Sequence, residues 1–223
     1  LGAKPARIPP SAGAEPLCRA MTAGRISAVI VPALSTLAPG KDAAGQLAAL
    51  ASLLCEIREA GVPLTILCSD ENVYRAQQHP WYAREEDLTG GETAAGLSMS
   101  LLQAYADGVS RGLCGDAVHT ICVRHMPTLG SGSPATLQYT NWCRALLAGE
   151  VVNVCNPAMQ GVFLHPLDMA CGALALGARF FAGEEPGIFN LGPGPLSLCA
   201  NRSAALRLIA RHGGTRPIQE SEP

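Results

Sequence analysis

Residues 63–74 read PLTILCSDENVY, and this stretch decides the fold. Its first part, residues 63–69, is a short apolar run that predicts a buried β-strand. Just before it, residues 43–60 repeat apolar side chains at helical spacing, and Gly61 is a natural stop for that helix. The alternation continues through about residue 125, with further strands expected at 27–34 and 119–125 and a further helix at 98–111. This order predicts an α/β fold, a parallel sheet with flanking helices.

The rest of the chain predicts a smaller region packed on this sheet. Helical patterns cover residues 136–148, 166–182 and 201–212, and short strand-like runs cover residues 151–155 and 188–191. The polar tail at 213–223 is expected to fray. We therefore expect two regions, an α/β core at residues 1–135 and a small C-terminal lobe at residues 136–223.

The composition excludes several classes of protein. Of the 223 residues, 48% are apolar and 15% are charged, which is typical of a well-buried globular chain. The net charge of −2 gives no attraction to nucleic acid or to an anionic membrane. No apolar run reaches the roughly 18 residues of a membrane span, and no signal-peptide pattern is present. We expect a cytoplasmic protein that binds neither nucleic acid nor membrane.

Nine cysteines are spread along the chain, at 18, 55, 68, 114, 122, 143, 155, 171 and 199. No two form a CxxC pair, and none clusters with histidine at zinc-binding spacing. Most stand in apolar runs. We therefore expect buried cysteines that act as small hydrophobic residues in a reducing compartment, without a metal site.

Polar residues follow two of the predicted strands. Residues 69–74 follow the strand at 63–69, and residues 124–128 follow the strand at 119–125. Because sites in parallel sheets lie beyond the carboxyl ends of the strands, we expect both segments to meet in one crevice. The chain contains no nucleophile elbow, phosphate-binding loop or zinc-protease motif, so acid–base chemistry is the expected kind.

Four residues of these segments are candidate catalytic groups. Asp70 and Glu71 are adjacent carboxylates, of which a regular strand would point only one into the crevice. Either one is a general base whose pKa is raised by burial, or both are solvated turn residues. Tyr74 is a candidate hydrogen-bond donor or else a half-buried ring. His125 is suited to proton transfer near neutral pH, or else it is a satisfied buried histidine.

Six further residues are candidate substrate contacts, namely Ser69, Arg84, Arg124, Thr128, Asn156 and His165. Two of them have structural alternatives. Arg84 can form an ion pair with Glu85 beside the site. His165 and Asp168 stand near a predicted helix start. An N-terminal helix cap with a stabilising acid in the first turn explains Asp168 without any contact to a substrate.

Four segments share their spacing with one enzyme family. They are SDENVY at 69–74, AREED at 83–87 with Gly90 and Gly91, VRHMPTLGSGSP at 123–134, and FNLGP at 189–193. Over roughly residues 17–212 the chain resembles the extended short-chain dehydrogenase/reductase family, and within it the nucleotide-sugar epimerases and 4,6-dehydratases, the CDP-glucose 4,6-dehydratases above all. The resemblance implies a Rossmann-like sheet with a small substrate lobe, and it places the family's dimer helices at 43–60 and 98–111.

The departures from this family concern its chemistry. The resemblance places the family's catalytic Tyr on Ala95, its Lys on Met99, its Ser/Thr on Asp70 and a sugar-nucleotide Arg on Gly161. Nothing before residue 27 resembles the family's glycine-rich turn, which holds the cofactor pyrophosphate. We therefore expect a truncated Rossmann-like fold, no bound NAD and no redox turnover.

Three hypotheses for the function follow. The first is a cofactor-independent enzyme that performs elimination, isomerisation or cyclisation on a small polar or sugar-derived metabolite, using Glu71 and His125. The second is a pseudoenzyme that binds a partner. The third is an NAD-dependent dehydratase or epimerase whose cofactor segment is absent from this chain. In each case we expect a homodimer, or a heterodimer with a related enzyme, through the helices at 43–60 and 98–111.

Overall fold

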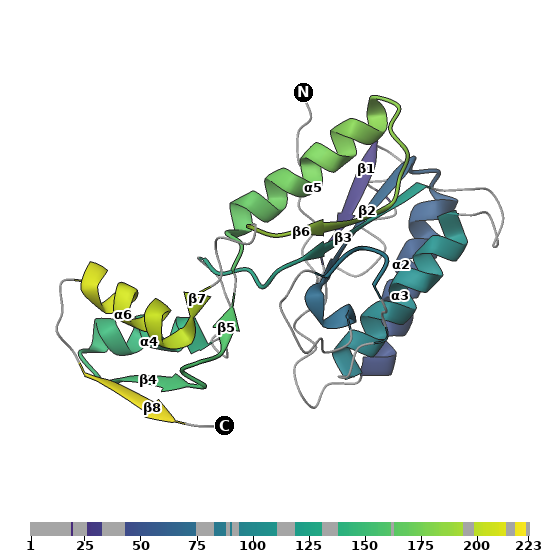
Figure 1. Ribbon diagram of the computed structural model, residues 1–223. Helices are drawn as coiled ribbons and strands as arrows, with labels where there is room; N and C mark the ends of the chain where they lie inside the picture. Colours follow the sequence, from purple (N-terminus) through teal and green to yellow (C-terminus); the bar gives the residue numbers. More distant parts are fainter. Residues whose placement is uncertain are drawn as a thin grey trace. The chain divides into compact units, whose positions relative to one another are not determined.

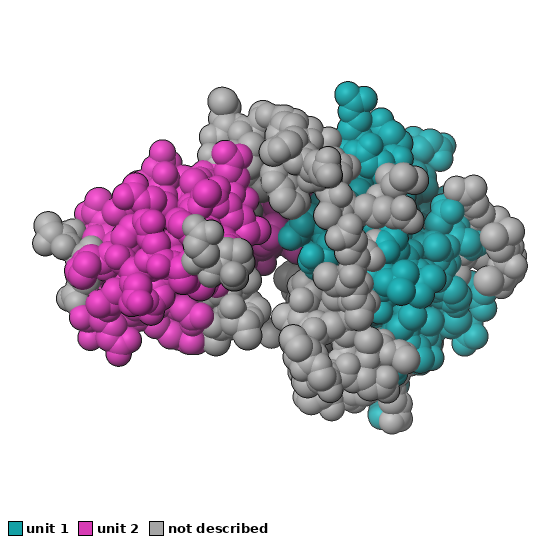
Figure 2. Space-filling view, turned by 60° about the horizontal axis from the view of Figure 1, so that its bottom comes forward, with its two compact units in different colours: residues 1–124, 173–190 teal, residues 125–172, 191–223 magenta. Residues whose placement is uncertain are grey.

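The structure is a computed structural model that describes residues 19, 26–32, 43–74, 83–87, 90, 94–110, 119–130, 138–161, 163–193, 199–212 and 217–221. The chain groups into two compact units, which Figure 2 colours separately. Unit 1 comprises Leu1–Arg124 and Ala173–Asn190, and unit 2 comprises His125–Gly172 and Leu191–Pro223. Both units are discontinuous in sequence, whereas the sequence pattern predicted a single boundary after residue 135.

The described strands of the main sheet lie in the order β1-β2-β3-β6 (Figure 1). They are β1 (Ala28–Val31), β2 (Leu64–Asp70), β3 (His119–His125) and β6 (Ile188–Leu191). β1 and β2 pair in parallel, with Ala28 opposite Leu64. β3 and β6 also run in parallel, because the Cys122 amide bonds the Gly187 carbonyl and the Met126 amide bonds the Leu191 carbonyl. The predicted α/β fold with a parallel sheet is confirmed.

Helices cover both faces of this sheet (Figure 1). α2 (Ala43–Glu59) and α3 (Ala94–Ser110) pack on one face, and α5 (Pro166–Phe181) packs on the other. Gly177 permits the close approach of α5, since a Cβ there would lie 3.1 Å from the Ile66 side chain. All residues of β2 are buried, as expected of a strand that is covered on both faces. Gly61 ends α2 with a φ of 66°, a conformation that favours glycine.

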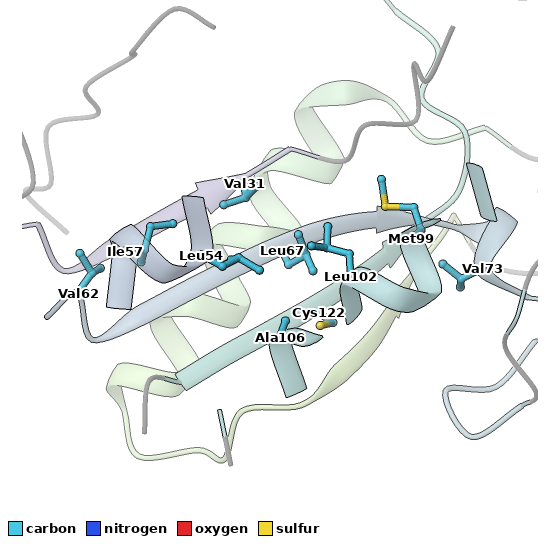
Figure 3. Packing of buried hydrophobic residues seen from close by; sticks show 10 residues of the cluster. All are labelled: Val31, Leu54, Ile57, Val62, Leu67, Val73, Met99, Leu102, Ala106 and Cys122. Carbon is cyan, nitrogen blue, oxygen red and sulfur yellow. The ribbon is translucent and has the colours of Figure 1, made fainter. Parts of the chain in front are cut away.

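A cluster of buried apolar side chains lies under α2 and α3. Figure 3 shows its buried side chains between the two helices and the sheet: Val31, Leu54, Ile57, Val62, Leu67, Val73, Met99, Leu102, Ala106 and Cys122. Helical spacing supplies Leu54 and Ile57 from α2 and Met99, Leu102 and Ala106 from α3. This core fixes the carboxyl end of β2, where the candidate catalytic residues stand.

Unit 2 has its own core, built around Trp142. The unit contains α4 (Gln138–Ala148), β4 (Val152–Cys155), α6 (Asn201–Arg211) and β8 (Ile218–Ser221). It also contains the short antiparallel pair β5 (Gln160–Gly161) and β7 (Cys199–Ala200). Its buried core residues are Trp142, Leu146, Val152, Val154, Ala205 and Ile209.

Two sequence expectations were wrong. The tail does not fray at 218–221, because β8 pairs in parallel with β4 and Arg202 Nε donates to Glu220 Oε1 at 2.7 Å. Only backbone pairing reveals this strand, since its side chains are mostly polar. Of the described cysteines, Cys68 and Cys122 are buried as expected, but Cys143, Cys155 and Cys171 are exposed, and all the described cysteines are free thiols. None of the described helices is long and apolar enough to cross a membrane.

Candidate active site

The carboxyl end of β2 turns directly into a short 3-10 helix, η2 (Glu71–Val73). Asp70 is only 4% exposed, and its Oδ1 accepts a hydrogen bond from the Asn72 amide at 3.0 Å. The carboxylate thus caps an N–H group that the start of a helix leaves without a partner. Because the strand ends at Asp70, Glu71 takes its direction from the turn and not from strand alternation.

Glu71 carries a carboxyl group in an unfavourable place for a charge. Burial raises its pKa from 4.5 to about 7, and the negative charge of Asp70 adds to this rise, while a hydrogen bond from its own backbone lowers it. Its Oε2 is shielded from solvent and has no hydrogen-bond partner within the described part of the chain. A carboxyl group with a pKa near 7 exchanges its proton readily at neutral pH, which suits general acid–base work.

Tyr74 is committed to two hydrogen bonds. Its hydroxyl donates to Asn190 Oδ1 at 2.6 Å and accepts from Arg124 Nη1 at 2.9 Å. The Arg124 guanidinium also lies 4.8 Å from the centroid of the Tyr74 ring, within the range of a cation–π contact. These contacts favour the structural alternative for Tyr74 over proton transfer.

Arg124 and Ser69 are likewise held by protein groups. Arg124 is 5% exposed, and its Nε and Nη2 both donate to Gln103 Oε1, at 3.0 and 2.9 Å. Its Nη1 also donates to the Glu85 carbonyl at 3.0 Å. Gln103 Nε2 donates in turn to Ser69 Oγ at 2.7 Å. Both residues thus belong to a buried polar network, which leaves them little freedom to bind a substrate.

Two members of this network, Gln103 and Asn190, were not among the residues predicted from the sequence. Gln103 is buried on the otherwise apolar helix α3. A single side-chain amide among apolar residues indicates a buried hydrogen-bond partner, and this signal could have found Gln103. Asn190 stands in the quoted FNLGP segment, and its Nδ2 donates to the Ala83 carbonyl at 2.7 Å. Nothing in the sequence of β6 points to that partner, because it lies far away along the chain.

The expected ion pair between Arg84 and Glu85 is not found. Glu85 Oε1 instead accepts a hydrogen bond from the Asn190 amide at 2.7 Å. The Arg84 side chain is 77% exposed and approaches Glu86 at 4.0 Å, while its amide donates to Asp87 Oδ2 at 2.8 Å and closes a turn. Its charged end is therefore open to solvent.

His125 and Thr128 belong to unit 2 and are described with it. His125 is 6% exposed, and its Nδ1 lies 2.8 Å from the Met126 carbonyl. Because a carbonyl can only accept, Nδ1 carries the proton in this hydrogen bond. Thr128 forms an isolated parallel bridge with Leu164. A catalytic role for His125 and a binding role for Thr128 stay predictions.

Asn156 and His165 are placed by local geometry in unit 2. Asn156 has a φ of 49°, a left-handed conformation that asparagine tolerates better than most residues. Its carbonyl accepts from Asn201 Nδ2 at 3.1 Å. His165 is exposed, and its Nδ1 accepts from the Leu167 amide at 3.2 Å, at the start of α5. The predicted cap is thus made by His165, with Asp168 in the first turn behind it.

The family resemblance placed a catalytic lysine at position 99, where this chain has Met99. A lysine that transfers protons needs polar surroundings, and the surroundings of Met99 are apolar. Met99 is 2% exposed and lies in the apolar core (Figure 3). The side chain of Ala95 lies outside the described residues, as do Cys18 and Cys114. Across the ranges that the structure describes, no group of three His, Cys, Asp or Glu side chains could hold a metal ion.

Comparison with known proteins identifies the fold. No protein-family model and no curated protein matches the sequence. The solved structure of Bordetella bronchiseptica WbmG, in complex with NAD and UDP, is 18% identical with a TM-score of 0.73 and covers 95% of this chain and 64% of its own. The UDP-glucose 4-epimerase of Thermus thermophilus, with NAD, is 16% identical with a TM-score of 0.75, covering 94% and 69%. The dTDP-glucose 4,6-dehydratase DesIV of Streptomyces venezuelae is 17% identical with a TM-score of 0.75, covering 94% and 64%.

The chain therefore spans about two thirds of the length of these structures. It has the Rossmann-like α/β fold of nucleotide-sugar epimerases and dehydratases. At such low identity, the similarity extends to the fold alone.

Proposed function

We propose that this protein is a non-redox acid–base enzyme of the lyase or isomerase type, acting on a small polar or sugar-derived metabolite, with Glu71 transferring the proton. The observation that carries the proposal is the Glu71 carboxyl group. Its pKa is raised to about 7 by burial, and its Oε2 has no partner among the described residues. Perturbed carboxyl groups of this kind cluster at functional sites.

The chemistry follows from the environment of this carboxyl group. An ionised Glu71 is disfavoured by burial and by the negative charge of Asp70, so taking a proton from a substrate C–H or O–H group relieves an unfavourable charge. The same carboxylic acid can return the proton to another substrate atom in an isomerisation, or to a leaving group in an elimination. The sugar-derived substrate class is supported by the fold, since the similar solved structures are nucleotide-sugar enzymes.

The NAD-dependent alternative draws support from the three solved structures, all of which are described with NAD. Among the described residues, Met99 does not fit the proton transfer that accompanies hydride chemistry. The resemblance puts the family's lysine at Met99, a thioether that is buried in the apolar core and carries no proton. No step of the proposed reaction therefore passes through a nicotinamide.

Replacing Glu71 with Gln is expected to slow the reaction at least about tenfold, because a positioned acid or base contributes about 10²–10⁴-fold. The measurement is deuterium incorporation from D₂O into a panel of keto-sugar and uronic-acid nucleotides, in which a carbonyl group makes the neighbouring C–H acidic, followed by NMR with no nicotinamide added. In the unmodified protein the rate should rise as pH increases through about 7, since the base form is then populated. Glu86→Gln is the matched control, because Glu86 is exposed. Full activity of Glu71→Gln would disprove the proposal. His125→Ala, measured alongside, tests the second predicted group.

A partner-binding pseudoenzyme is the second candidate function. The observation that favours it is the outer side of α3, where Leu97 and Leu101 are 50% and 52% exposed one turn apart. Leucines at such positions are suited to packing against another helix. On α2, by contrast, Leu50 and Leu53 pack against the core, so changing them would damage the fold itself.

The double variant Leu97→Glu with Leu101→Glu is expected to convert a dimer into a monomer. Stable interfaces usually bury more than about 1,200 Å² in total, and a charge without a partner would be costly there. Sedimentation of the unmodified protein and of the variant is the measurement. Leu147→Glu is the control, because Leu147 is 78% exposed on α4. A monomeric unmodified protein would contradict a homodimer through α2 and α3.

A further inference from the structure

Helix α5 exposes a row of large apolar side chains. Its buried residues are Ala173 and Gly177, and Gly177 lies against β2. Elsewhere on the helix, Leu167, Leu174 and Phe181 are 63%, 60% and 54% exposed. Residues seven positions apart lie on one side of a helix, so these three form a single row, the α5 row. Among the described side chains, no other helix exposes three large apolar residues.

The gaps along the α5 row are filled by small residues and carry no charge. At helical spacing, Ala170, Cys171 and Ala178 stand between its three large members. Single exposed leucines are common on protein surfaces, whereas a continuous apolar patch marks an interaction site. The α5 row is therefore suited to packing against another helix.

The pattern of the α5 row is symmetric about its middle residue. Leu167 and Phe181 stand seven positions on either side of Leu174, and Ala170 and Ala178 stand four positions on either side. If a second α5 packs antiparallel with a two-fold axis at Leu174, the two copies of Leu174 meet at the axis. Leu167 of each copy then meets Phe181 of the other. A two-fold dimer requires such a surface, one that is complementary to itself.

The charges on the exposed side of α5 agree with this arrangement. Asp168 lies in the first turn and Arg179 in the last turn, and both are exposed. In the antiparallel pair, Asp168 of one copy lies beside Arg179 of the other at both ends of the contact. Arg179 also pairs with Glu184 of its own chain, but its five N–H donors leave room for a second carboxylate. In a parallel pair, by contrast, like charges would meet at both ends.

We propose that α5 is a self-association surface, through which two copies of this chain pair antiparallel about a two-fold axis at Leu174. Symmetry and charge both select a second copy as the occupant of the surface. The proposal is independent of the role of Glu71. It also concerns a different surface from that of Leu97 and Leu101, because α5 and α3 lie on opposite faces of the sheet (Figure 1).

The size of the contact sets its strength. α5 has 16 residues, so it is about 24 Å long. One pair of helices of this length covers less than the roughly 1,200 Å² of a stable interface. We therefore expect a weak dimer, with a dissociation constant of about 10–100 µM. Such a dimer adds little to the stability of the folded chain and is dissociated in dilute protein.

The experiment is sedimentation of the full chain over a concentration series from about 1 µM to about 500 µM, which spans the expected dissociation constant. Every protein carries Leu97→Glu and Leu101→Glu, so that a contact through α3 does not contribute. Leu174→Glu is expected to weaken the association at least about tenfold, because it buries two like charges at the two-fold axis. Leu147→Glu adds the same charge to α4, at a position that is 78% exposed, and should leave the association unchanged.

Two charge reversals test the antiparallel direction. Asp168→Arg or Arg179→Asp alone brings like charges together at both ends and should weaken the association at least about threefold. Mixed in equal amounts, the two variants form a dimer with opposite charges at both ends, so the association should return to its original strength. A parallel pair predicts no loss in either single variant, because like charges already meet in it.

Three outcomes would overturn the proposal. The first is a chain that stays monomeric at the highest concentration of the series. The second is a Leu174→Glu variant that associates as strongly as Leu147→Glu, since the contact would then lie away from α5. The third is an unchanged association in both charge variants, because the antiparallel pair requires Asp168 and Arg179 to meet.

Discussion

Glu71→Gln is expected to stabilise the folded protein by about 3 kcal/mol above pH 7 and to change its stability little below pH 4.5. The Glu71 pKa is about 7 in the folded protein and close to 4.5 in an unfolded chain, so the folded state binds this proton more tightly. The stabilisation from that proton is fully present below pH 4.5 and is lost as the pH rises through 7. Glutamine does not ionise, so the variant avoids this loss.

Urea unfolding at pH values below 4.5 and above 7 measures the effect. The unmodified protein should lose about 3 kcal/mol more than Glu71→Gln between the two conditions. Glu86→Gln serves as the control because that side chain is exposed, and its stability should follow the unmodified protein at both pH values. Parallel losses in the unmodified protein and in Glu71→Gln would mean that the charge of Glu71 is not buried in solution.

The direction of this effect bears on the function. A residue that serves only the fold weakens it when it is replaced, whereas a residue kept for chemistry can be replaced with a gain in stability. A Glu71→Gln variant that is both more stable and slower would therefore identify Glu71 as a catalytic group. A gain in stability without a loss of activity would mean that the buried Glu71 carboxyl group destabilises the η2 turn and has no catalytic role.

The sequence predicted the sheet and its helices well because their signals are local. The apolar run before Ser69 gave β2, and the helical spacing of residues 43–60 gave α2 with its glycine stop at Gly61. Strand β3 was predicted with the bounds that the structure has, His119–His125. In each of these elements the buried apolar side chains follow the pattern of a helix or of a buried strand. This pattern can be recognised in the sequence without knowing which element packs against it.

The candidate site was predicted less completely because its contacts are distant in sequence. The sequence drew attention to Glu71 and Arg124, but not to the partners that give them their properties. Arg124 is held by Gln103 and Tyr74, and the Ala83 carbonyl is held by Asn190, which is 107 positions away along the chain. Strand β8 was missed for the same reason, since only its pairing with β4 orders it.

The second large effect is expected at Trp142, in the core of unit 2. Trp142→Ala should destabilise this unit by about 3–5 kcal/mol, the usual range for a buried aromatic residue. Trp142 is 1% exposed and packs on Tyr139 with ring centroids 4.4 Å apart. Its Nε1 also donates to the Asn153 carbonyl at 2.6 Å, so the variant leaves that acceptor without its donor. Small domains have only about 5–15 kcal/mol of stability, so much of unit 2 should open.

Hydrogen exchange across β4 and α6 measures this opening, and the loop at Asn156 should lose its protection as well, because β4 leads directly into it. Trp142→Phe keeps a ring but loses the donor, and it should cost about 1–3 kcal/mol. Phe181→Ala, at a position that is 54% exposed, removes an aromatic ring outside the core and should stay within about 0.5 kcal/mol. If Trp142→Ala and Phe181→Ala destabilise the protein equally, the Trp142 cluster is not the core of unit 2. If Trp142→Ala also speeds hydrogen exchange throughout β2, the two units do not unfold independently. The Asn156 loop and the Glu71 turn would then open in the same cooperative unfolding event.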